Sequence, residues 1–202
     1  MNEREDIMTK YGLYIYPNAV SHETCELLSR TIKQESLMYK YFTNSNQKND
    51  ELVVDNSFSM YGPMCLEALT EMLLPKMEKV TGKKLAPTYS YTRIYYNGAS
   101  MEKHTDRPSC EYSATLTLSI TEKPWMIWVK DLTGDERPVN LLVGDMCVYK
   151  GQTVPHWRDR YEGEEQIQAF LHYVDVNGPN AKFKYDGRPM MGMHPSTRRK
   201  GE

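Results

Sequence analysis

The sequence lacks any long apolar run and any excess of charge of one sign. With 25 basic and 27 acidic residues among 202, the chain has no overall attraction for nucleic acid or for an anionic membrane surface. No stretch approaches the roughly 20 apolar residues that a transmembrane helix needs, and the opening MNEREDIMTK is charged where a secretory signal is apolar. We therefore expect a soluble, cytoplasmic protein without a membrane or nucleic-acid partner.

Cysteine and phenylalanine are scarce. The four cysteines form no CxxC pair, which argues against a zinc knuckle, and nothing in their spacing demands a disulfide. Only four phenylalanines stand against fifteen tyrosines and thirteen methionines. Because tyrosine combines an aromatic body with a hydroxyl, we expect some tyrosines to line a polar site and most to pack.

Helices are predicted in the first part of the chain. Residues 11–18 alternate as a short strand, and Ser21 is then placed to cap a helix that begins at His22. A second helix is expected from near Pro63 to Gly82, with a kink or a split at Pro75. The polar, Asn-rich segment 41–59 predicts a long loop and is the natural candidate for a lid.

Strands are predicted from residue 86 onward. Helices first and strands afterwards favour an α+β fold in which two helices buttress a β-sandwich or barrel. We expect one domain, with an N-terminal part (1–85), a β core (86–176) and an irregular, basic, partly disordered tail (177–202). The expected strands of the core are 88–96, 111–120, 125–130, 138–143, 146–150, 154–160 and 166–175.

The most informative motif is His104-Thr105-Asp106, followed further along the chain by His156. Side chains two apart on a strand point the same way, and a distant strand can return His156 beside them. Two histidines and one carboxylate that leave other positions open are the ligand set of non-haem Fe(II) oxygenases. The alternative for His104 to Asp106 is a capped turn, and the spacing alone does not decide between the two.

The remaining histidines have plainer interpretations. His22 follows a helix cap and is expected to be exposed, while His194 falls in the tail and is expected to be disordered. His172 lies in an apolar strand, where a hydrogen-bonded sheet histidine is favoured over a ligand.

Polar strand faces accompany the motif. Tyr89, Tyr91, Arg93 and Tyr95 share one face of their strand and predict a hydrogen-bonding wall. The strand SATLTLS likewise places its serines and threonines on one face and its apolar residues on the other. One face of each strand can then line a wet pocket while the other packs.

Three further side chains near the motif have open interpretations. Arg158, two residues after His156, either enters the same cavity, where it can hold a carboxylate co-substrate, or is a surface charge. Trp157 either shields the metal from water or packs in the core. Arg107 and Glu111 either contact substrate or form a surface ion pair, and the ion pair is favoured.

The segments RIYYNG, HTD, ATLTLSI, GDMCVYKG and PHW follow one another in order over residues 88–175, with a weaker echo in YIYPNAVSHETCELLSRTI. In this order they resemble the prolyl-4-hydroxylase-like branch of the Fe(II)/2-oxoglutarate dioxygenases, and most closely its short bacterial and phage members. The resemblance implies a double-stranded β-helix (a jelly-roll, cupin-like fold) with supporting N-terminal helices. It implies that His104, Asp106 and His156 bind iron and that Tyr95 hydrogen-bonds 2-oxoglutarate.

The activity implied by this resemblance is hydroxylation with Fe(II), 2-oxoglutarate and O2, with ascorbate as a further candidate cofactor and succinate and carbon dioxide as co-products. The substrate can be a peptidyl proline, a free amino acid or a small metabolite. Two alternatives stay open, a non-catalytic cupin-type binding module and an iron dioxygenase that does not use 2-oxoglutarate.

The chain departs from the family pattern at one important place. The family has a basic residue about nine to eleven positions beyond the distal histidine, and this chain has Glu165, Gln166 and Ile167 there. The Gly-Gly-x-Thr segment of many prolyl hydroxylases is also replaced, by KPWMIWVKD. We therefore expect Arg158 to replace the missing anchor for 2-oxoglutarate, with Arg93 and Arg107 in reserve.

Overall fold

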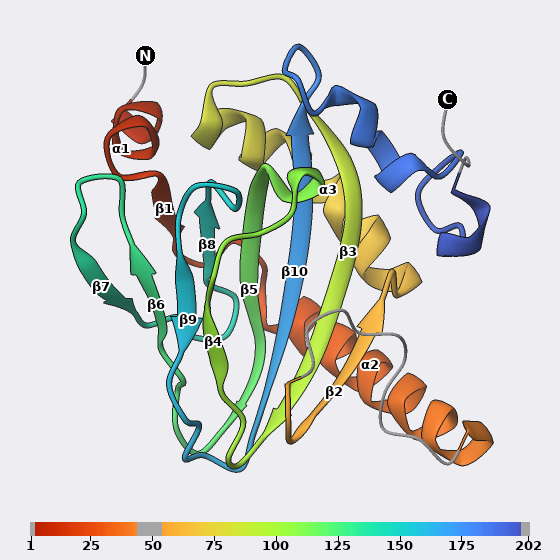
Figure 1. The fold of residues 1–202 in the computed structure, drawn as a ribbon. Coiled ribbons are helices and arrows are strands. Elements are labelled where there is room, and N and C mark those ends of the chain that lie inside the picture. The colour runs from red at the N-terminus through yellow and green to blue at the C-terminus, as the bar shows by residue number, and fades with distance from the viewer. Residues whose placement is uncertain (1–2, 44–53, 199–202) are drawn as a thin grey trace.

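Two antiparallel sheets form the framework of the chain. The computed structural model describes residues 3–43 and 54–198 (Figure 1). The six-stranded sheet has the order β1 (Leu13–Tyr16), β8 (Met146–Tyr149), β5 (Tyr112–Thr121), β10 (Glu165–Asp175), β3 (Leu85–Tyr96), β2 (Ser57–Tyr61). The four-stranded sheet has the order β4 (Met101–His104), β9 (His156–Arg158), β6 (Ile127–Lys130), β7 (Glu136–Val139) and lies in front of the larger sheet in Figure 1.

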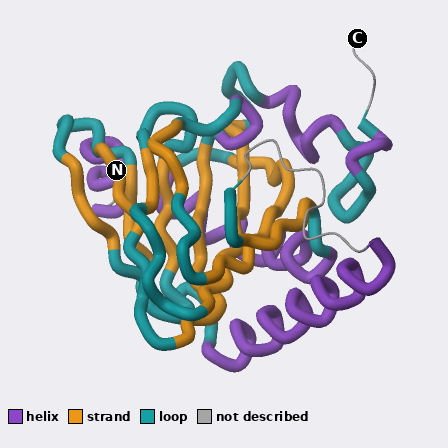
Figure 2. The backbone as a smooth tube through the Cα atoms, turned by 60° about the horizontal axis from the view of Figure 1, so that its bottom comes forward, coloured by secondary structure: helices purple, strands orange, loops and turns teal. Residues whose placement is uncertain are grey.

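Helices cover the outer side of the larger sheet. Helices α2 (His22–Thr43) and α3 (Met64–Thr81) lie behind it, and α1 (Glu3–Tyr11) packs against α3 (Figures 1 and 2). The C-terminal residues form short 3-10 turns, Ala181–Gly187 and Pro195–Thr197, and the first of these lies beside β3. A third 3-10 turn, Pro108–Cys110, follows β4. Among the described helices, none has the length and apolar character needed to cross a bilayer.

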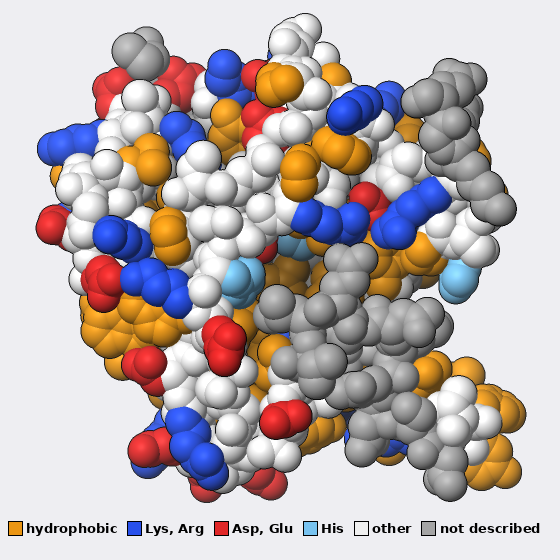
Figure 3. Space-filling view, in the orientation of Figure 1, with side chains coloured by type: hydrophobic (Ala, Val, Ile, Leu, Met, Phe, Trp, Pro, Cys, Tyr) orange, Lys and Arg blue, Asp and Glu red, His pale blue; other side chains and the backbone are white. Residues whose placement is uncertain are grey.

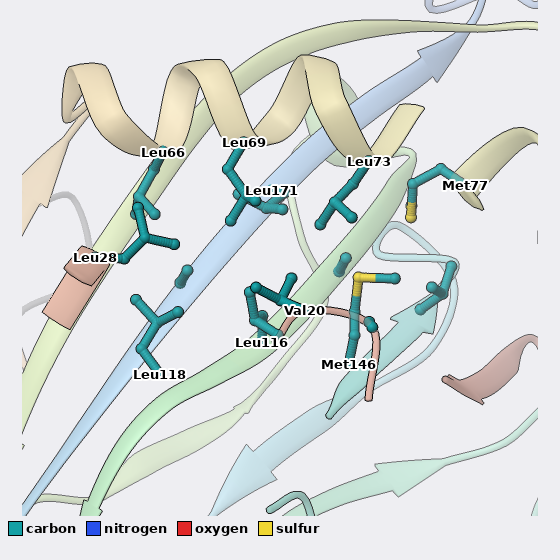
Figure 4. Packing of buried hydrophobic residues seen from close by; sticks show 14 of the residues in the cluster. Val20, Leu28, Leu66, Leu69, Leu73, Met77, Leu116, Leu118, Met146 and Leu171 are labelled. Atoms are coloured by element: carbon teal, nitrogen blue, oxygen red, sulfur yellow. The ribbon is translucent and has the colours of Figure 1, made fainter. Parts of the chain in front are cut away.

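The main core lies between α2, α3 and the larger sheet. The apolar stripe of α3 (Leu66, Leu69, Leu73, Met77) faces Leu116 of β5 and Leu171 of β10 (Figure 4). Each of these fully buried leucines contributes about 1.5–3 kcal/mol of hydrophobic free energy. Because strand side chains alternate, the polar residues of β5 (Ser113, Thr115, Thr117) are turned to the opposite face, which is the interior between the two sheets.

The predicted helices are present, with differences in detail. The Ser21 hydroxyl accepts the Thr24 N–H at 3.3 Å, as expected of a cap, and Gly82 ends α3 in the left-handed conformation (φ 66°). Helix α3 runs through Pro75 as one helix, so a split there is excluded. Buried Leu73 and Met77 on either side of Pro75 stabilise the helix against the loss of one backbone hydrogen bond. Helix α1, in which only Met8 is buried, was not predicted.

The strand predictions also largely hold. The expected loop 41–59 is shorter, since α2 extends to Thr43 and β2 begins at Ser57, where it pairs with β3. The lid proposed for that loop falls mostly on residues 44–53, which lie outside the described residues. Strand β7 begins two residues earlier than predicted, at Glu136.

Candidate metal centre

Three candidate metal ligands meet where β4, at the edge of the smaller sheet, pairs with β9. His104 ends β4 and is the register partner of His156 at the start of β9. The two imidazole centroids are 4.3 Å apart. Asp106 Oδ1 lies 3.8 Å from His104 Nε2 and 3.6 Å from His156 Nε2. One ligand atom from each side chain lies within 4.8 Å of the others, so the structure brings together the three residues that the sequence pattern selected.

Hydrogen bonds orient each of these side chains. The Nδ1 atoms of His104 and His156 lie 2.8 Å from Glu102 O and 3.0 Å from Val154 O. A carbonyl can only accept, so both Nδ1 atoms carry a proton, and both Nε2 atoms face Asp106, where each has a lone pair in the neutral imidazole. The other oxygen, Asp106 Oδ2, accepts the Ser113 hydroxyl at 3.0 Å. Two imidazole lone pairs converging on a carboxylate repel one another unless a cation lies between them.

Burial keeps the distal histidine neutral. His156 is 3% exposed, and its burial lowers the pKa of the imidazole below the ordinary value. The neutral imidazole is the form that binds a metal ion.

A cavity of about 750 Å³ opens beside these residues. Tyr89, Tyr91, Arg93 and Tyr95 all line it, as the alternation along β3 predicted. Figure 3 shows the hollow on the front face, with histidine and apolar side chains in its wall and basic side chains above it. The remaining lining residues are Tyr61, Met101, His104, Thr105, Asp106, Arg107, Cys110, Tyr149, His156, Phe170, His172, His194, Pro195 and Arg198.

Comparison with known proteins identifies solved structures that have a similar fold. No family model matches the chain, and no curated protein is similar to it in sequence. Among solved structures, HygX from Streptomyces hygroscopicus with nickel and 2-oxoglutarate bound superposes with a TM-score of 0.66 at 11% identity, over 88% of each chain. A Pseudomonas putida prolyl-4-hydroxylase gives 0.60 at 14% identity, over 84% of this chain and 96% of that one. A Burkholderia pseudomallei oxidoreductase of the 2OG-Fe(II) oxygenase family gives 0.64 at 12% identity, over 88% and 91%.

The chain has the fold of the 2-oxoglutarate–Fe(II) oxygenases. The resemblance seen in the sequence is therefore confirmed at the level of the fold. In this oxygenase fold the candidate ligands of the present chain lie at the edge of a cavity large enough for a co-substrate and a drug-sized molecule.

Close to the candidate metal ligands lies a buried arginine that has no carboxylate partner among the residues that the structure describes. Arg158 is 2% exposed, donates to Trp125 O, and has its Cζ 4.9 Å from the Trp125 ring centroid. Burial lowers the pKa of its guanidinium, and the nearby groups with the largest effect are Tyr95, Tyr149, Cys147 and Tyr161, none of which is a carboxylate. The surface-charge interpretation of Arg158 is thus wrong.

Tyr95 shares this environment. Its ring packs 4.9 Å from the Trp125 centroid, and its side chain is fully buried. Among the described residues, neither the Tyr95 hydroxyl nor Arg158 Nε has a hydrogen-bond partner. Such atoms are rare in folded proteins and call for a polar ligand. Arg158 does not line the cavity itself, whereas Tyr95 and Arg93 do. Arg93 is also buried, with its Cζ 5.5 Å from the Tyr91 ring centroid.

The interpretations of Trp157 and of an Arg107–Glu111 ion pair are wrong. Trp157 neither faces the candidate ligands nor lies in the core. It is half-buried on the outer face of the smaller sheet and stacks on Trp128, with centroids 6.0 Å apart. Arg107 pairs with Asp186 at 3.1 Å instead of Glu111, whose carboxylate accepts the Asp175 N–H.

The structure agrees with the prediction for His172 and disagrees with the one for His194. His172 is buried and hydrogen-bonded to the Ser113 hydroxyl at 2.9 Å, as predicted for a sheet histidine, and burial lowers its pKa to about 4. His194, predicted to be disordered, lines the cavity.

Asp106, Cys110 and His172 form a second group at metal-binding distances. Without a metal ion, burial raises the pKa of the Cys110 thiol to about 12, and its sulfur is hydrogen-bonded with the Tyr89 hydroxyl at 3.1 Å.

Proposed function

We propose that this protein is an Fe(II)- and 2-oxoglutarate-dependent dioxygenase that hydroxylates a small molecule or a peptidyl substrate. The observation that carries the proposal is the convergence of two imidazole Nε2 atoms and one carboxylate oxygen at the edge of a cavity of about 750 Å³. Two histidines and one carboxylate with open positions suit Fe(II). The likeness of the fold to HygX structures, one with nickel and 2-oxoglutarate bound and another with iron bound, supports the same assignment.

In this proposal the fold is a double-stranded β-helix within a single oxygenase domain. Support comes from the order of the strands, because the chain passes repeatedly between the two sheets from β3 to β10. Strands β3, β5, β8 and β10 belong to the larger sheet, and β4, β6, β7 and β9 to the smaller one. Residues 1–85 then supply the supporting helices, and 177–202 form the tail.

Fe(II) would be held by His104 Nε2, His156 Nε2 and Asp106. Bound there with 2-oxoglutarate and O2, it supplies the oxidising chemistry of hydroxylation, with succinate and carbon dioxide as co-products. The contribution of the chain is to fix the three ligand atoms before the metal arrives. Two backbone carbonyls hold the imidazole tautomers, and the Ser113 hydroxyl holds the carboxylate.

2-Oxoglutarate would be anchored by Arg158 and Tyr95. Its far carboxylate accepts hydrogen bonds, and these two side chains hold donor atoms that lack a partner among the described residues. A carboxylate would also neutralise the buried guanidinium, which otherwise costs free energy. Arg93, on the same face of β3 as Tyr95, is the second candidate anchor. This assignment replaces the basic residue that the family pattern places further along the chain.

The chain's other contribution is to exclude water from the reacting centre. Aromatic side chains from four strands (Tyr61, Tyr91, Tyr149 and Phe170) line the cavity. Their apolar surfaces lower the local dielectric constant, which strengthens the electrostatic interactions of the bound co-substrate.

The proposal is tested by measuring succinate formation and O2 uptake by the Fe(II)-loaded protein with and without 2-oxoglutarate. We expect O2 uptake that requires 2-oxoglutarate and matches succinate formation. His104→Ala and Asp106→Ala should abolish both, and His22→Ala, which changes an exposed helical histidine, should leave them unchanged. O2 uptake that ignores 2-oxoglutarate would instead indicate an iron dioxygenase of another kind. No uptake with any candidate substrate would indicate a binding module.

A further inference from the structure

The C-terminal segment 185–198 forms one side of the cavity. His194, Pro195 and Arg198 line it together with residues of β2 and β3 and the candidate metal ligands. The tail was expected to be irregular and partly disordered, but it has a defined backbone up to residue 198, and its part Ala181–Gly187 packs against β3. A segment that lines the cavity contributes to the choice of substrate.

A buried ion pair fixes this segment to the body of the protein. Arg188 donates to Glu67 Oε2 at 2.9 Å, and the two side chains are 0% and 2% exposed. The same Glu67 oxygen accepts the Gly192 N–H at 2.8 Å, and Glu67 Oε1 accepts the Ser90 hydroxyl at 2.9 Å. Arg188 also donates to Thr88 O. Because every carboxylate oxygen is hydrogen-bonded, the pair holds the segment in one place relative to α3 and β3.

Asp186 then connects the segment to the loop that carries the candidate ligand Asp106. Its carboxylate, 4% exposed, accepts the Tyr61 hydroxyl at 2.7 Å and Arg107 Nη2 at 3.1 Å, and also pairs with Arg198. Tyr185 and Asp186 have left-handed backbone angles, φ 56° and 55°. Such angles cost about 1–3 kcal/mol each and persist only where the surroundings fix them. The backbone is thus held in an unfavourable conformation that delivers the Asp186 carboxylate between two arginines.

The arrangement leaves a positive charge facing the cavity. Two guanidiniums share one carboxylate, and the Arg107 and Arg198 side chains are 35% and 38% exposed while Asp186 is buried. Both arginines line the cavity and Asp186 does not. Among the described lining residues the only carboxylate is Asp106, which the proposed metal would neutralise. A fixed guanidinium is suited to bind carboxylate or phosphate oxygens through two hydrogen bonds.

An aromatic surface lies directly beside these two arginines. Tyr61 and Tyr89 are stacked, with centroids 4.9 Å apart and planes at 8°. The Cζ atoms of Arg107 and Arg198 lie 4.5 Å from the Tyr89 centroid and 5.4 Å from the Tyr61 centroid. A molecule that joins an anionic group to a flat or apolar body would satisfy both parts of this surface.

We propose that segment 185–198 is a specificity-determining wall, and that Arg107 and Arg198, aligned by Asp186, bind a carboxylate or phosphate group of the substrate. The proposal rests on the proposed oxygenase function, because it names the class of molecule presented to that site. Arg158 and Tyr95 are left to 2-oxoglutarate, so the two anions have separate anchors.

The test measures binding of three matched probes to the protein loaded with Ni(II) and 2-oxoglutarate, by ligand-observed NMR. The probes are 3-phenylpropionate, phenyl phosphate and the neutral 3-phenylpropionamide. We expect one or both anions to bind with a Kd at least tenfold lower than that of the amide. The stronger anion distinguishes a carboxylate from a phosphate. Equal behaviour of all three probes, including no binding by any, would overturn the proposal.

Variants locate the binding to these arginines. Arg198→Gln should raise the Kd of the anions about tenfold and leave that of the amide unchanged, and Arg198→Lys should restore part of the difference. The control is Arg30→Gln, which changes an arginine that also pairs with one carboxylate but lies exposed on α2. An Arg198→Gln protein that keeps the wild-type preference for anions would overturn the assignment.

Measurements of metal and 2-oxoglutarate binding distinguish a failure of this inference from a failure of the proposed oxygenase function. The affinity for 2-oxoglutarate should be the same in Arg198→Gln and in the wild type, and a large loss would mean that these arginines hold the co-substrate instead. If the protein failed to bind metal or 2-oxoglutarate, the oxygenase proposal would fail. The preference for anionic probes could still be measured on the protein without them.

Discussion

Replacement of Arg158 by methionine should remove most of the stabilisation of the protein by 2-oxoglutarate without destabilising the ligand-free protein. Arg158 is 2% exposed, and the groups that most affect its charge include no carboxylate. Methionine fills a similar volume without the buried charge, so the ligand-free variant should be as stable as the wild type or more stable. With 2-oxoglutarate, the variant lacks the charge-assisted hydrogen bonds to the carboxylate. Such a loss costs about 2–5 kcal/mol, which is roughly a 30- to 5,000-fold increase in Kd.

Thermal unfolding of the Ni(II)-loaded protein measures this effect. At a 2-oxoglutarate concentration 100 times the wild-type Kd, binding stabilises the folded state by about 2.7 kcal/mol. For a chain of this size that corresponds to a rise in Tm of about 5–10 °C. The rise should fall to about a third or less in Arg158→Met and persist in full in Arg160→Met, which changes an exposed arginine two residues away.

The same experiment distinguishes the two candidate anchors. Equal rises in Tm for the wild type and Arg158→Met would refute the assignment of Arg158. If Arg93→Met lost the rise and Arg158→Met kept it, the anchor would be Arg93, which lines the cavity directly. A marked drop in the Tm of ligand-free Arg158→Met would contradict the inference that its buried charge has no carboxylate counter-ion within the described part of the chain.

Two further predictions concern stability. Glu67→Leu should destabilise the fold by about 3–5 kcal/mol because it leaves Arg188 buried and unpaired. The double variant Glu67→Leu/Arg188→Leu should lose less free energy of unfolding, because no buried charge remains. Urea unfolding measures both, and a double variant less stable than the single one would contradict this prediction. Burial lowers the pKa of His172 from 6.5 to about 4, so the unfolded chain binds a proton between these values that the folded protein does not. Stability should therefore rise with pH from 4 to 6.5, by about 3 kcal/mol from this group. In His172→Phe this contribution to the rise in stability with pH should vanish. If the pH dependence of the free energy of unfolding were unchanged in that variant, His172 would not be its source.

The parts of the site that follow strand periodicity could be predicted from the sequence. Alternation along β3 places Tyr89, Tyr91, Arg93 and Tyr95 on one face, and the structure has all four in the cavity. The HxD motif and His156 come together because β4 and β9 are paired strands. The same alternation also determines the direction of Trp157. With His156 and Arg158 facing inward, Trp157 has to face outward, where it is found.

The parts that depend on distant contacts could not be predicted. Asp186 lies in a segment without periodicity, and its partner Arg107 is 79 residues earlier in the chain. Its left-handed backbone has no signal in the sequence because it is held by tertiary hydrogen bonds rather than by a glycine. Glu67 likewise has the position of an ordinary helical carboxylate, and only the folded tail reveals its buried partner. Helix α1 is polar along most of its length, so its pattern does not stand out.

The central claim is that His104, Asp106 and His156 hold a metal ion to which 2-oxoglutarate binds. It is tested most directly by anaerobic calorimetric titration of 2-oxoglutarate into the protein with and without Fe(II). We expect tight binding only with Fe(II), and none in Asp106→Ala under either condition, because the metal supplies most of the affinity. Binding of equal strength without metal, or in Asp106→Ala, would contradict it.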